Sequence, residues 1–264
     1  MGNEICMGPK VAILSLEESY ITKRQEDLKI NQVSIKDIEK ELKKYAQKGF
    51  ISENLFIKQL LSLKLLKGDS NNFKIDEIKD SVKYAKFYSN FIFELKCQVD
   101  NFILGLIPMT SDSKSDKIDI ICKILDFNKS NTITKKQFCC ILIHYLRPSA
   151  DYIVNFASDY PYKDRKYFLD LLCKLKSGIS VTSNKLSKKI MPRIDIININ
   201  ELKERLKYDS LNLLFDSTML RTEILSHYHT DSDSLLNDPC SLHRKDSSIN
   251  HPLDLKYSHS ASEF

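Results

Sequence analysis

Oxygen-bearing residues recur at regular intervals between Asp126 and Gln137 in a chain of 264 residues. Counted from Asp126 as the first of twelve positions, positions 1, 3, 5, 7, 9 and 12 hold Asp126, Asn128, Ser130, Thr132, Thr134 and Gln137. Each can supply an oxygen, Thr132 through its backbone carbonyl. Carboxylate, amide, hydroxyl and carbonyl oxygens are the ligands that Ca²⁺ takes, so the spacing indicates a loop able to surround a calcium ion.

The stretches on either side of this loop predict two amphipathic helices. Apolar residues follow helical spacing before it and after it: Ile118, Ile121, Cys122 and Leu125, then Phe138, Ile141, Leu142 and Tyr145. Pro148 is expected to end the second helix, because proline cannot continue the hydrogen-bond ladder. Ile133, at position 8, is an apolar residue of the kind that pairs two such loops through a short strand.

Helix, loop and helix together resemble an EF-hand of the calmodulin superfamily. The resemblance implies a helix–loop–helix fold, calcium as the ligand, and pairing with further units of the same kind. Position 6 holds Asn131 where the family has Gly, and Asn tolerates the left-handed turn that this position needs. Position 12 holds Gln137 where the family has a bidentate Glu.

The exchange at position 12 leaves Asp126 as the only carboxylate among the six ligand positions. Affinity for Ca²⁺ follows the number of charged ligands, so one carboxylate predicts weak binding. Two interpretations stay open. The loop binds calcium weakly, or it keeps the shape of an EF-hand without binding.

Three further stretches are candidate loops of this kind. Around 44–55, Gly49 to Ser52 match positions 6 to 9, but no ligand stands at positions 1, 3 and 5. Residues 69–82, with Ile75 near position 8, and residues 174–190 are the second and fourth candidates. All three are expected to be degenerate and to serve only as scaffold.

The start of the chain carries a possible lipidation site. Removal of Met1 exposes Gly2, the substrate for N-myristoylation, although the usual motif has Ser or Thr where this chain has Cys6. Cys6 is itself a reasonable palmitoylation site, and two acyl chains anchor a protein stably where one does not. The opening Met-Gly-Asn-Glu resembles the start of the calcineurin regulatory subunit, another EF-hand protein. The alternative is that Gly2 is merely a small second residue.

Composition favours a helical protein in a reducing compartment. The chain has few glycines, and its seven cysteines are scattered without a CxxC pair, which argues for the cytosol. A net charge of +5 is too small to imply nucleic-acid binding. No apolar run is long enough to span a bilayer. Basic residues dominate 163–193, either as a surface for anionic lipid or as a solvated helix face.

We therefore expect an all-α fold of paired EF-hand units, mostly with degenerate loops, followed by a disordered C-terminal tail. The expected segments are an acylated segment (1–30), a degenerate EF-hand-like half (31–110), a second EF-hand half (111–195), an amphipathic helical extension (196–228) and the tail (229–264). A single helix is expected over 75–106 and another over 200–215. The main strand candidate is the stretch 193–200.

No catalytic motif is evident, so the chain is not expected to be an enzyme. The favoured function is that of a cytoplasmic, membrane-associated EF-hand regulatory or scaffold protein. Such a protein binds a partner helix, and calcium is a weak or absent input. The alternative function is that of a constitutive structural protein, cytoskeletal or ciliary, whose loops are relics.

Overall fold

The computed structural model describes residues 16–66, 81–158 and 165–231. Within these residues the chain is mostly helical with two small antiparallel sheets, consistent with the helical class expected from the sequence. The elements of the N-terminal half are α1 (Leu16–Asp27), the 3₁₀ turn η1 (Ile30–Gln32), α2 (Ile35–Tyr45), β1 (Phe50–Ser52), α3 (Glu53–Ser62), α4 (Ser81–Ser89), β2 (Ile92–Phe93), β3 (Lys96–Gln98), α5 (Val99–Leu106) and η3 (Ile107–Met109).

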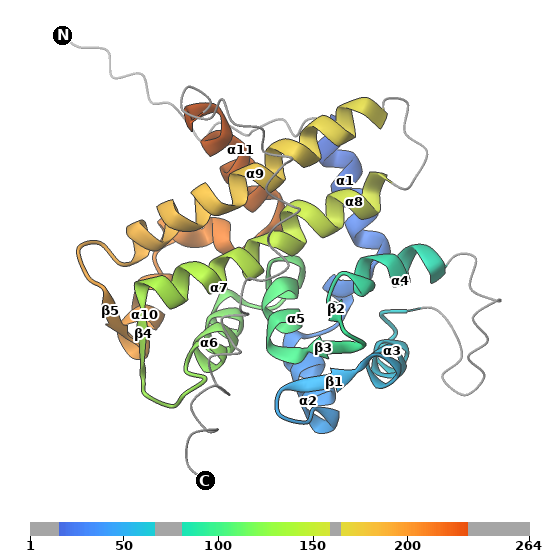
Figure 1. Cartoon of the computed structure of the whole chain (residues 1–264), viewed down its shortest axis with the longest axis horizontal. Helices are drawn as coiled ribbons and strands as arrows, with labels where there is room; N and C mark the ends of the chain where they lie inside the picture. The colour runs from blue at the N-terminus through green and yellow to red at the C-terminus, as the bar shows by residue number, and fades with distance from the viewer. Residues whose placement is uncertain (1–15, 67–80, 159–164, 232–264) are drawn as a thin grey trace.

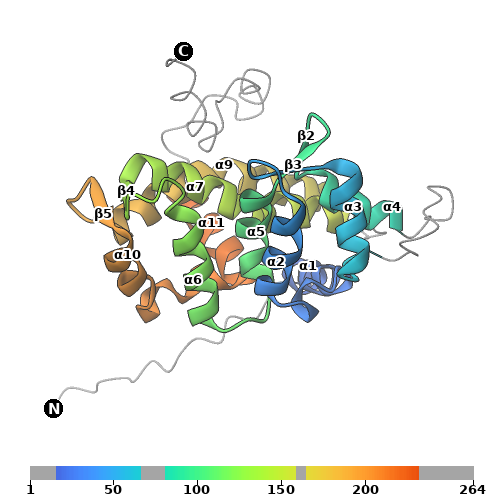
Figure 2. The same cartoon turned by 90° about the horizontal axis from the view of Figure 1, so that it is seen from below.

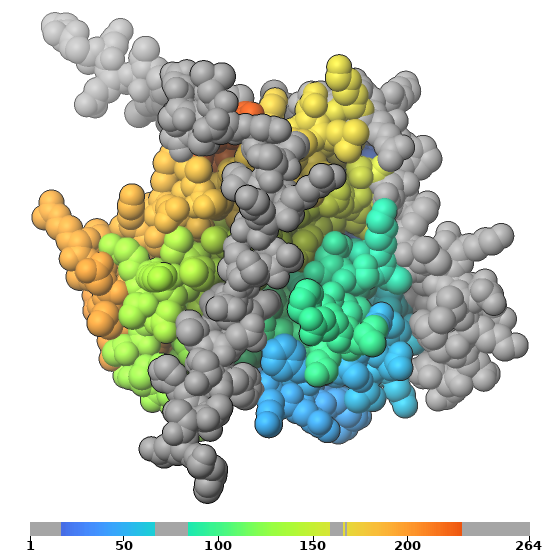
Figure 3. Space-filling view, in the orientation of Figure 1, coloured from blue at the N-terminus to red at the C-terminus, as the bar shows by residue number. Residues whose placement is uncertain are grey.

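The C-terminal half continues directly from this series. Its elements are α6 (Lys114–Leu125), β4 (Thr132–Thr134), α7 (Lys135–Arg147), the π-helical turn η4 (Pro148–Tyr152), α8 (Ile153–Ser158), α9 (Arg165–Ile190), β5 (Ile196–Asn198), α10 (Ile199–Leu206), the 3₁₀ segment η5 (Asp209–Phe215) and α11 (Ser217–Asp231). The two halves lie side by side and share one hydrophobic core (Figures 1–3). Residues 232–264, most of the expected tail, lie outside the described residues, whereas residues 229–231 belong to α11.

Each half contains one short pair of antiparallel strands that joins two helix–loop–helix segments. In the N-terminal half β1 pairs with β3, with Ile51 opposite Cys97, and β2 extends the sheet as a hairpin. In the C-terminal half β4 pairs with β5, with Ile133 opposite Ile197. All four central residues are buried. The apolar residues expected at position 8 of the first and third loops are thus the ones that anchor the strand pairs.

The two strand pairs share the same flanking hydrogen bonds. The bonds run from Val99 N to Gly49 O (3.0 Å), from Glu53 N to Leu95 O (2.9 Å), from Ile199 N to Asn131 O (3.0 Å) and from Lys135 N to Asp195 O (2.7 Å). In each pair, the backbone N–H of the residue that follows one strand donates to the carbonyl of the residue that precedes the other strand. The two halves of the molecule therefore repeat one local design.

The prediction of one helix over 75–106 is wrong for the part of that stretch that is described. The chain leaves α4 at Ser89, forms the β2–β3 hairpin and re-enters a helix at Val99. Glu94 and Leu95 form the hairpin turn with φ of 48° and 61°, a left-handed backbone that L-residues rarely adopt. The expected second loop at 69–82, including Ile75, lies almost entirely outside the described residues, and β3 is the strand that pairs with β1.

The prediction of a fourth loop at 174–190 is also wrong, because this stretch is the C-terminal part of α9. Gly178, within this stretch, serves helix packing. A Cβ built on it lies 2.7 Å from Cγ2 of Ile224, so only glycine allows α9 and α11 to approach this closely. The strand expected within 193–200 is confirmed as β5.

The strand β5 begins just after the segment boundary expected at residue 195. Because β5 pairs with β4, the pairing joins residues on both sides of that boundary. The helix predicted over 200–215 is confirmed in its first part as α10, and its second part is the 3₁₀ segment η5. The stretch 1–30, expected as an acylated segment, includes α1, which packs against α8.

The α-helix that follows the loop ends at Arg147 with Pro148 at its C-cap, as predicted. The chain does not leave the helical conformation there, however. Pro148 has helical φ and ψ of −61° and −40°, and the chain continues through η4 into α8. Proline removes one backbone donor and crowds the preceding turn, and a widened π turn is a known way to accommodate such a disturbance. Residues 135–158 thus form one nearly continuous helical rod that contacts α5, α9, α11 and α1.

Charged groups contribute to the contact between the two halves. Lys123 of α6 and Lys43 of α2 both reach Glu39 of α2, at 2.8 and 2.9 Å. Burial raises the pKa of Glu39, but the hydrogen bonds from the two lysines outweigh it and hold that pKa below its ordinary value. Asp112 accepts hydrogen bonds from Ser34 Oγ and Ile35 N, at 2.7 and 2.8 Å, which fixes the start of α2 against the second half.

The crossing of α5 and η4 depends on a glycine. A Cβ built on Gly105 lies 2.5 Å from Cγ of Pro148, which is too close for any real contact. We predict that Gly105→Ala lowers the free energy of unfolding by about 1–3 kcal/mol, because overpacking outweighs the better helix propensity of Ala. Urea unfolding followed by circular dichroism measures the change.

The matched control is Gly105→Ala combined with Pro148→Ala, which removes the clashing ring atom. The double variant should regain part of the stability that Gly105→Ala loses relative to its own Pro148→Ala background. Strictly additive effects of the two substitutions would contradict the proposed clash.

Candidate functional site

The predicted calcium loop begins at the C-cap of α6 and forms a compact turn. Asp126 Oδ1 accepts a hydrogen bond from the backbone N–H of Asn131 at 2.8 Å, which ties the first position of the loop to the sixth. Asn131 has a left-handed φ of 54°, as its place at position 6 predicts, and Lys129 has the same φ. The turn therefore forms without glycine.

Oxygens of the middle positions gather around the hydroxyl of Ser130. Ser130 Oγ lies 2.7 Å from Asn128 Oδ1 and 3.1 Å from the carbonyl oxygen of Thr132. All three residues are exposed. This arrangement fits a hard cation in its donor chemistry, because amide, hydroxyl and carbonyl oxygens converge on one place.

Positions 9 and 12 are engaged in another task. Thr134 Oγ1 accepts from Gln137 N at 3.2 Å, and Gln137 Oε1 accepts from the backbone N–H of Thr134 at 3.0 Å. The Thr134 hydroxyl also donates to Gln137 Oε1 at 2.9 Å. This reciprocal arrangement is a capping box, which satisfies backbone donors at the start of α7. The oxygen that would complete a calcium site therefore serves as a helix cap.

The charge of the loop is unfavourable for a cation. Between positions 126 and 137 it carries one carboxylate, Asp126, and three lysines, Lys129, Lys135 and Lys136, so its formal charge is +3 − 1 = +2. Among the described residues, no group of three or more His, Cys, Asp or Glu side chains is placed to hold a metal. The loop thus has the shape and part of the oxygen set of a calcium site, but not its charge.

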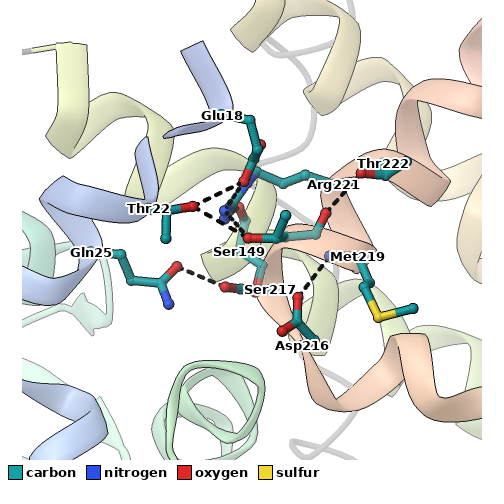
Figure 4. A network of polar contacts seen from close by, with 10 residues as sticks. Glu18, Thr22, Gln25, Ser149, Asp216, Ser217, Met219, Arg221 and Thr222 are labelled. Atoms are coloured by element: carbon teal, nitrogen blue, oxygen red, sulfur yellow. Dashed lines mark hydrogen bonds and ion pairs between the residues drawn. The ribbon is translucent and has the colours of Figure 1, made fainter. Parts of the chain in front are cut away.

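A second polar site, which the sequence did not suggest, lies between α1, η4 and α11. The Arg221 side chain is only 1% exposed and carries a charge into the core. Its Nε lies 3.0 Å from both carboxylate oxygens of Glu18, its Nη2 pairs with the same carboxylate, and its Nη1 donates to the carbonyl oxygen of Ser149 at 3.1 Å. Figure 4 shows Glu18 and Arg221 pointing toward each other from α1 and α11.

Neighbouring polar contacts extend this site along α1. The hydroxyls of Thr22 and Thr218 lie 3.4 Å apart, and Ser217 Oγ donates to Gln25 Oε1 at 2.7 Å (Figure 4). A buried guanidinium is tolerated only when it is paired, and removing one partner of a buried ion pair typically costs about 3–5 kcal/mol. In the sequence, this site is indicated only by the position of Arg221 between Leu220 and Ile224, both buried, on the apolar side of the helix.

Gly2 and Cys6, the predicted lipidation residues, lie outside the described residues. Comparisons of the chain with family models, with curated proteins and with solved structures found no match.

We predict that Gln137 limits calcium binding at the loop. Gln137→Glu adds a negative charge and a second oxygen, and Glu at this position still supports the capping box, so the fold should be kept. If the natural loop binds, we expect a Kd of roughly 10⁻⁴–10⁻³ M. Gln137→Glu should tighten this Kd by about tenfold or more, equivalent to about 1.4 kcal/mol. Isothermal titration calorimetry with CaCl₂ measures both proteins.

Asp126→Asn is the matched control, because it removes the charge but keeps an oxygen that can accept from Asn131 N. It should abolish binding, and so should Asp126→Ala. Binding that survives both substitutions places the calcium ion elsewhere. A silent Gln137→Glu protein means that the loop keeps only the shape of a calcium site.

Proposed function

We propose that this chain is a regulatory or scaffold protein of the EF-hand type that binds a helical partner, with weak or absent calcium binding at 126–137. The observation that carries the proposal is the repeated strand pairing. Ile51 with Cys97 and Ile133 with Ile197 each join two helix–loop–helix segments, with the same flanking hydrogen bonds. EF-hand units characteristically associate in pairs through such short strands, and the oxygen spacing at 126–137 agrees with this class.

An interaction role is supported by apolar side chains that the core does not use. Phe93 and Leu95, at the tip of the β2–β3 hairpin, are 71% and 72% exposed. Large apolar side chains exposed at a hairpin tip stabilise their own fold little, whereas contact surfaces commonly present such residues. Proteins with paired helix–loop–helix units bind amphipathic helices through apolar anchors at helical spacing.

The calcium-independent form of this function is favoured by the charge of the loop. A net charge of +2 around a single carboxylate opposes a divalent cation, so partner binding is proposed to occur without calcium at cytosolic concentrations. The same observation also favours the second candidate, a constitutive structural protein whose loops are relics.

A titration with a model amphipathic helix separates these functions. A labelled amphipathic peptide should bind the full chain in EGTA, and millimolar CaCl₂ should change its Kd by less than about tenfold, because weak loops give small coupling. Fluorescence anisotropy measures the binding, and a hydrophobic dye reports any exposed apolar surface. A chain that binds no helix with or without calcium is a structural component. Strong calcium dependence would contradict the weak-loop assignment.

We further propose that the protein acts at the cytoplasmic face of a membrane, held there by acylation of Gly2 and Cys6. The described helices include none with the length and apolar character that a bilayer span requires. Exposed basic residues on and after α9, among them Lys166, Lys188 and Arg193, supply positive charge that would strengthen a lipid anchor.

Gly2→Ala should therefore move the protein from the membrane fraction to the soluble fraction of cells. Cys6→Ser should have a weaker effect in the same direction, because one acyl chain remains and gives marginal attachment. Fractionation followed by immunoblotting, with metabolic labelling by a myristate analogue, measures both. Unchanged partitioning of Gly2→Ala together with no label at Gly2 would contradict the proposal.

A further inference from the structure

The side chains of α1 that contact α11 lie on one face of the helix. Glu18, Ile21, Thr22, Gln25 and, just after the helix, Leu28 follow spacings of three, one, three and three, which place them on one side. Three of them meet α11. Glu18 pairs with Arg221 and Gln25 accepts from Ser217 (Figure 4), and the Thr22 hydroxyl lies 3.4 Å from that of Thr218. This face therefore carries three polar residues that each have a polar partner on α11, together with two apolar residues, Ile21 and Leu28.

The surface beneath α1 is built from three elements. The helix packs along α8, and the Tyr20 ring meets the Phe168 ring of α9 edge-on at 5.6 Å between centroids. The third element is α11, which supplies the polar partners. The helices α8, α9 and α11 thus all contact α1, and we call the surface that they present to it the α1 groove.

The helix α1 is held in this groove with little apolar burial. Among residues 17–27, only Ile21 is fully buried, and Leu28 follows just beyond. Elsewhere in the chain, α5 and α6 bury six or more residues each. A helix with one buried apolar residue depends on its polar contacts, and a second helix that reproduces those contacts can compete with it.

The proposed function includes binding of a partner helix, and the inference rests on that function. We propose that the α1 groove is the site of partner binding, that α1 occupies it in the isolated protein, and that the partner is an amphipathic helix with a carboxylate at the position of Glu18. The partner also carries apolar residues at the positions of Ile21 and Leu28.

The carboxylate is the specificity element. Arg221 is buried, and within the described residues its guanidinium pairs with Glu18, the Thr218 hydroxyl and the Ser149 carbonyl. A helix without an acid at this position would leave a buried charge without its counter-ion, which strongly disfavours its binding. The groove therefore selects a helix with an acid, followed by an apolar residue three positions later and a second one seven positions after that.

The test uses the full chain and a labelled synthetic peptide of residues 16–28 as the probe. The peptide should bind the Glu18→Gln protein about tenfold or more tightly than the wild type, because apparent affinity scales with the fraction of molecules whose groove is open. A second peptide, which carries Glu18→Gln, should bind about tenfold or more weakly to the same protein, because it lacks the counter-ion. This second comparison leaves the protein unchanged.

A locked variant provides the matched control. Thr22→Cys with Thr218→Cys places two thiols where hydroxyls now lie 3.4 Å apart, so oxidation should tie α1 into its groove. Peptide binding should disappear on oxidation and return on reduction, with the crosslink verified by mass spectrometry. Equal binding of the two peptides, or binding that survives the verified crosslink, would overturn the proposal.

Hydrogen exchange separates this inference from the proposed function. If the model amphipathic helix binds the wild-type chain and leaves the exchange of the α1 amides unchanged, helix binding is real but occurs elsewhere, and the groove assignment fails. If binding raises exchange in α1, the groove assignment stands. If no helix binds any variant, both proposals fail.

Discussion

The helical rod formed by residues 135–158 is the constraint on which the rest of the molecule depends. It begins in the candidate calcium loop, crosses α5 at Gly105 and passes between α9 and α1. Pro148 stands in its middle, where the ordinary ladder of hydrogen bonds cannot continue. The widened turn keeps the two parts of the rod in line, and a glycine on the facing helix supplies the space that the proline ring needs.

The same turn explains how a buried charge can lie at the centre of the fold. The Ser149 carbonyl lies within the π turn and accepts a hydrogen bond from Arg221, while Glu18 supplies the counter-charge from the opposite side. An unpaired guanidinium in this position would cost several kcal/mol, and a well-packed apolar residue would often serve stability as well or better. We therefore propose that the ion pair contributes specificity, by selecting which helix lies beside α11 and in which register.

The sequence predicts those parts of the fold that depend on local pattern. The strand pairing expected at Ile133 is confirmed, and Ile51, which matches the same position of its own candidate loop, also lies in a short strand. Thr134 and Gln137 were predicted as calcium ligands, and the structure shows that they form the capping box of α7. The predictions failed where tertiary contacts override local preference.

Particular residues illustrate that failure. Pro148 ends α7 as predicted, but its residue type does not show that the chain continues through η4. The stretch 174–190 is helix rather than loop, and Gly178 within it serves a close contact between helices that no local window contains. The turn at Leu95 has no glycine to announce it, so the hairpin was read as helix. For the candidate sites, the oxygen spacing was visible in the sequence, whereas the Glu18–Arg221 pair joins residues 203 positions apart.

The rod also connects the loop at 126–137 with the α1 groove, and magnitudes show what that connection can do. A cation that drew Gln137 into the loop would compete with the capping box, and a cap of this kind contributes about 0.5–2 kcal/mol. Breaking the buried pair that holds α1 costs about 3–5 kcal/mol, and reversing a 1:99 equilibrium requires about 5.5 kcal/mol. The loop alone therefore lacks the energy to release α1. The proposed partner helix, which would replace the Glu18 carboxylate with its own, avoids most of that cost. In the proposed function the partner therefore controls the groove, and calcium at most adjusts its affinity.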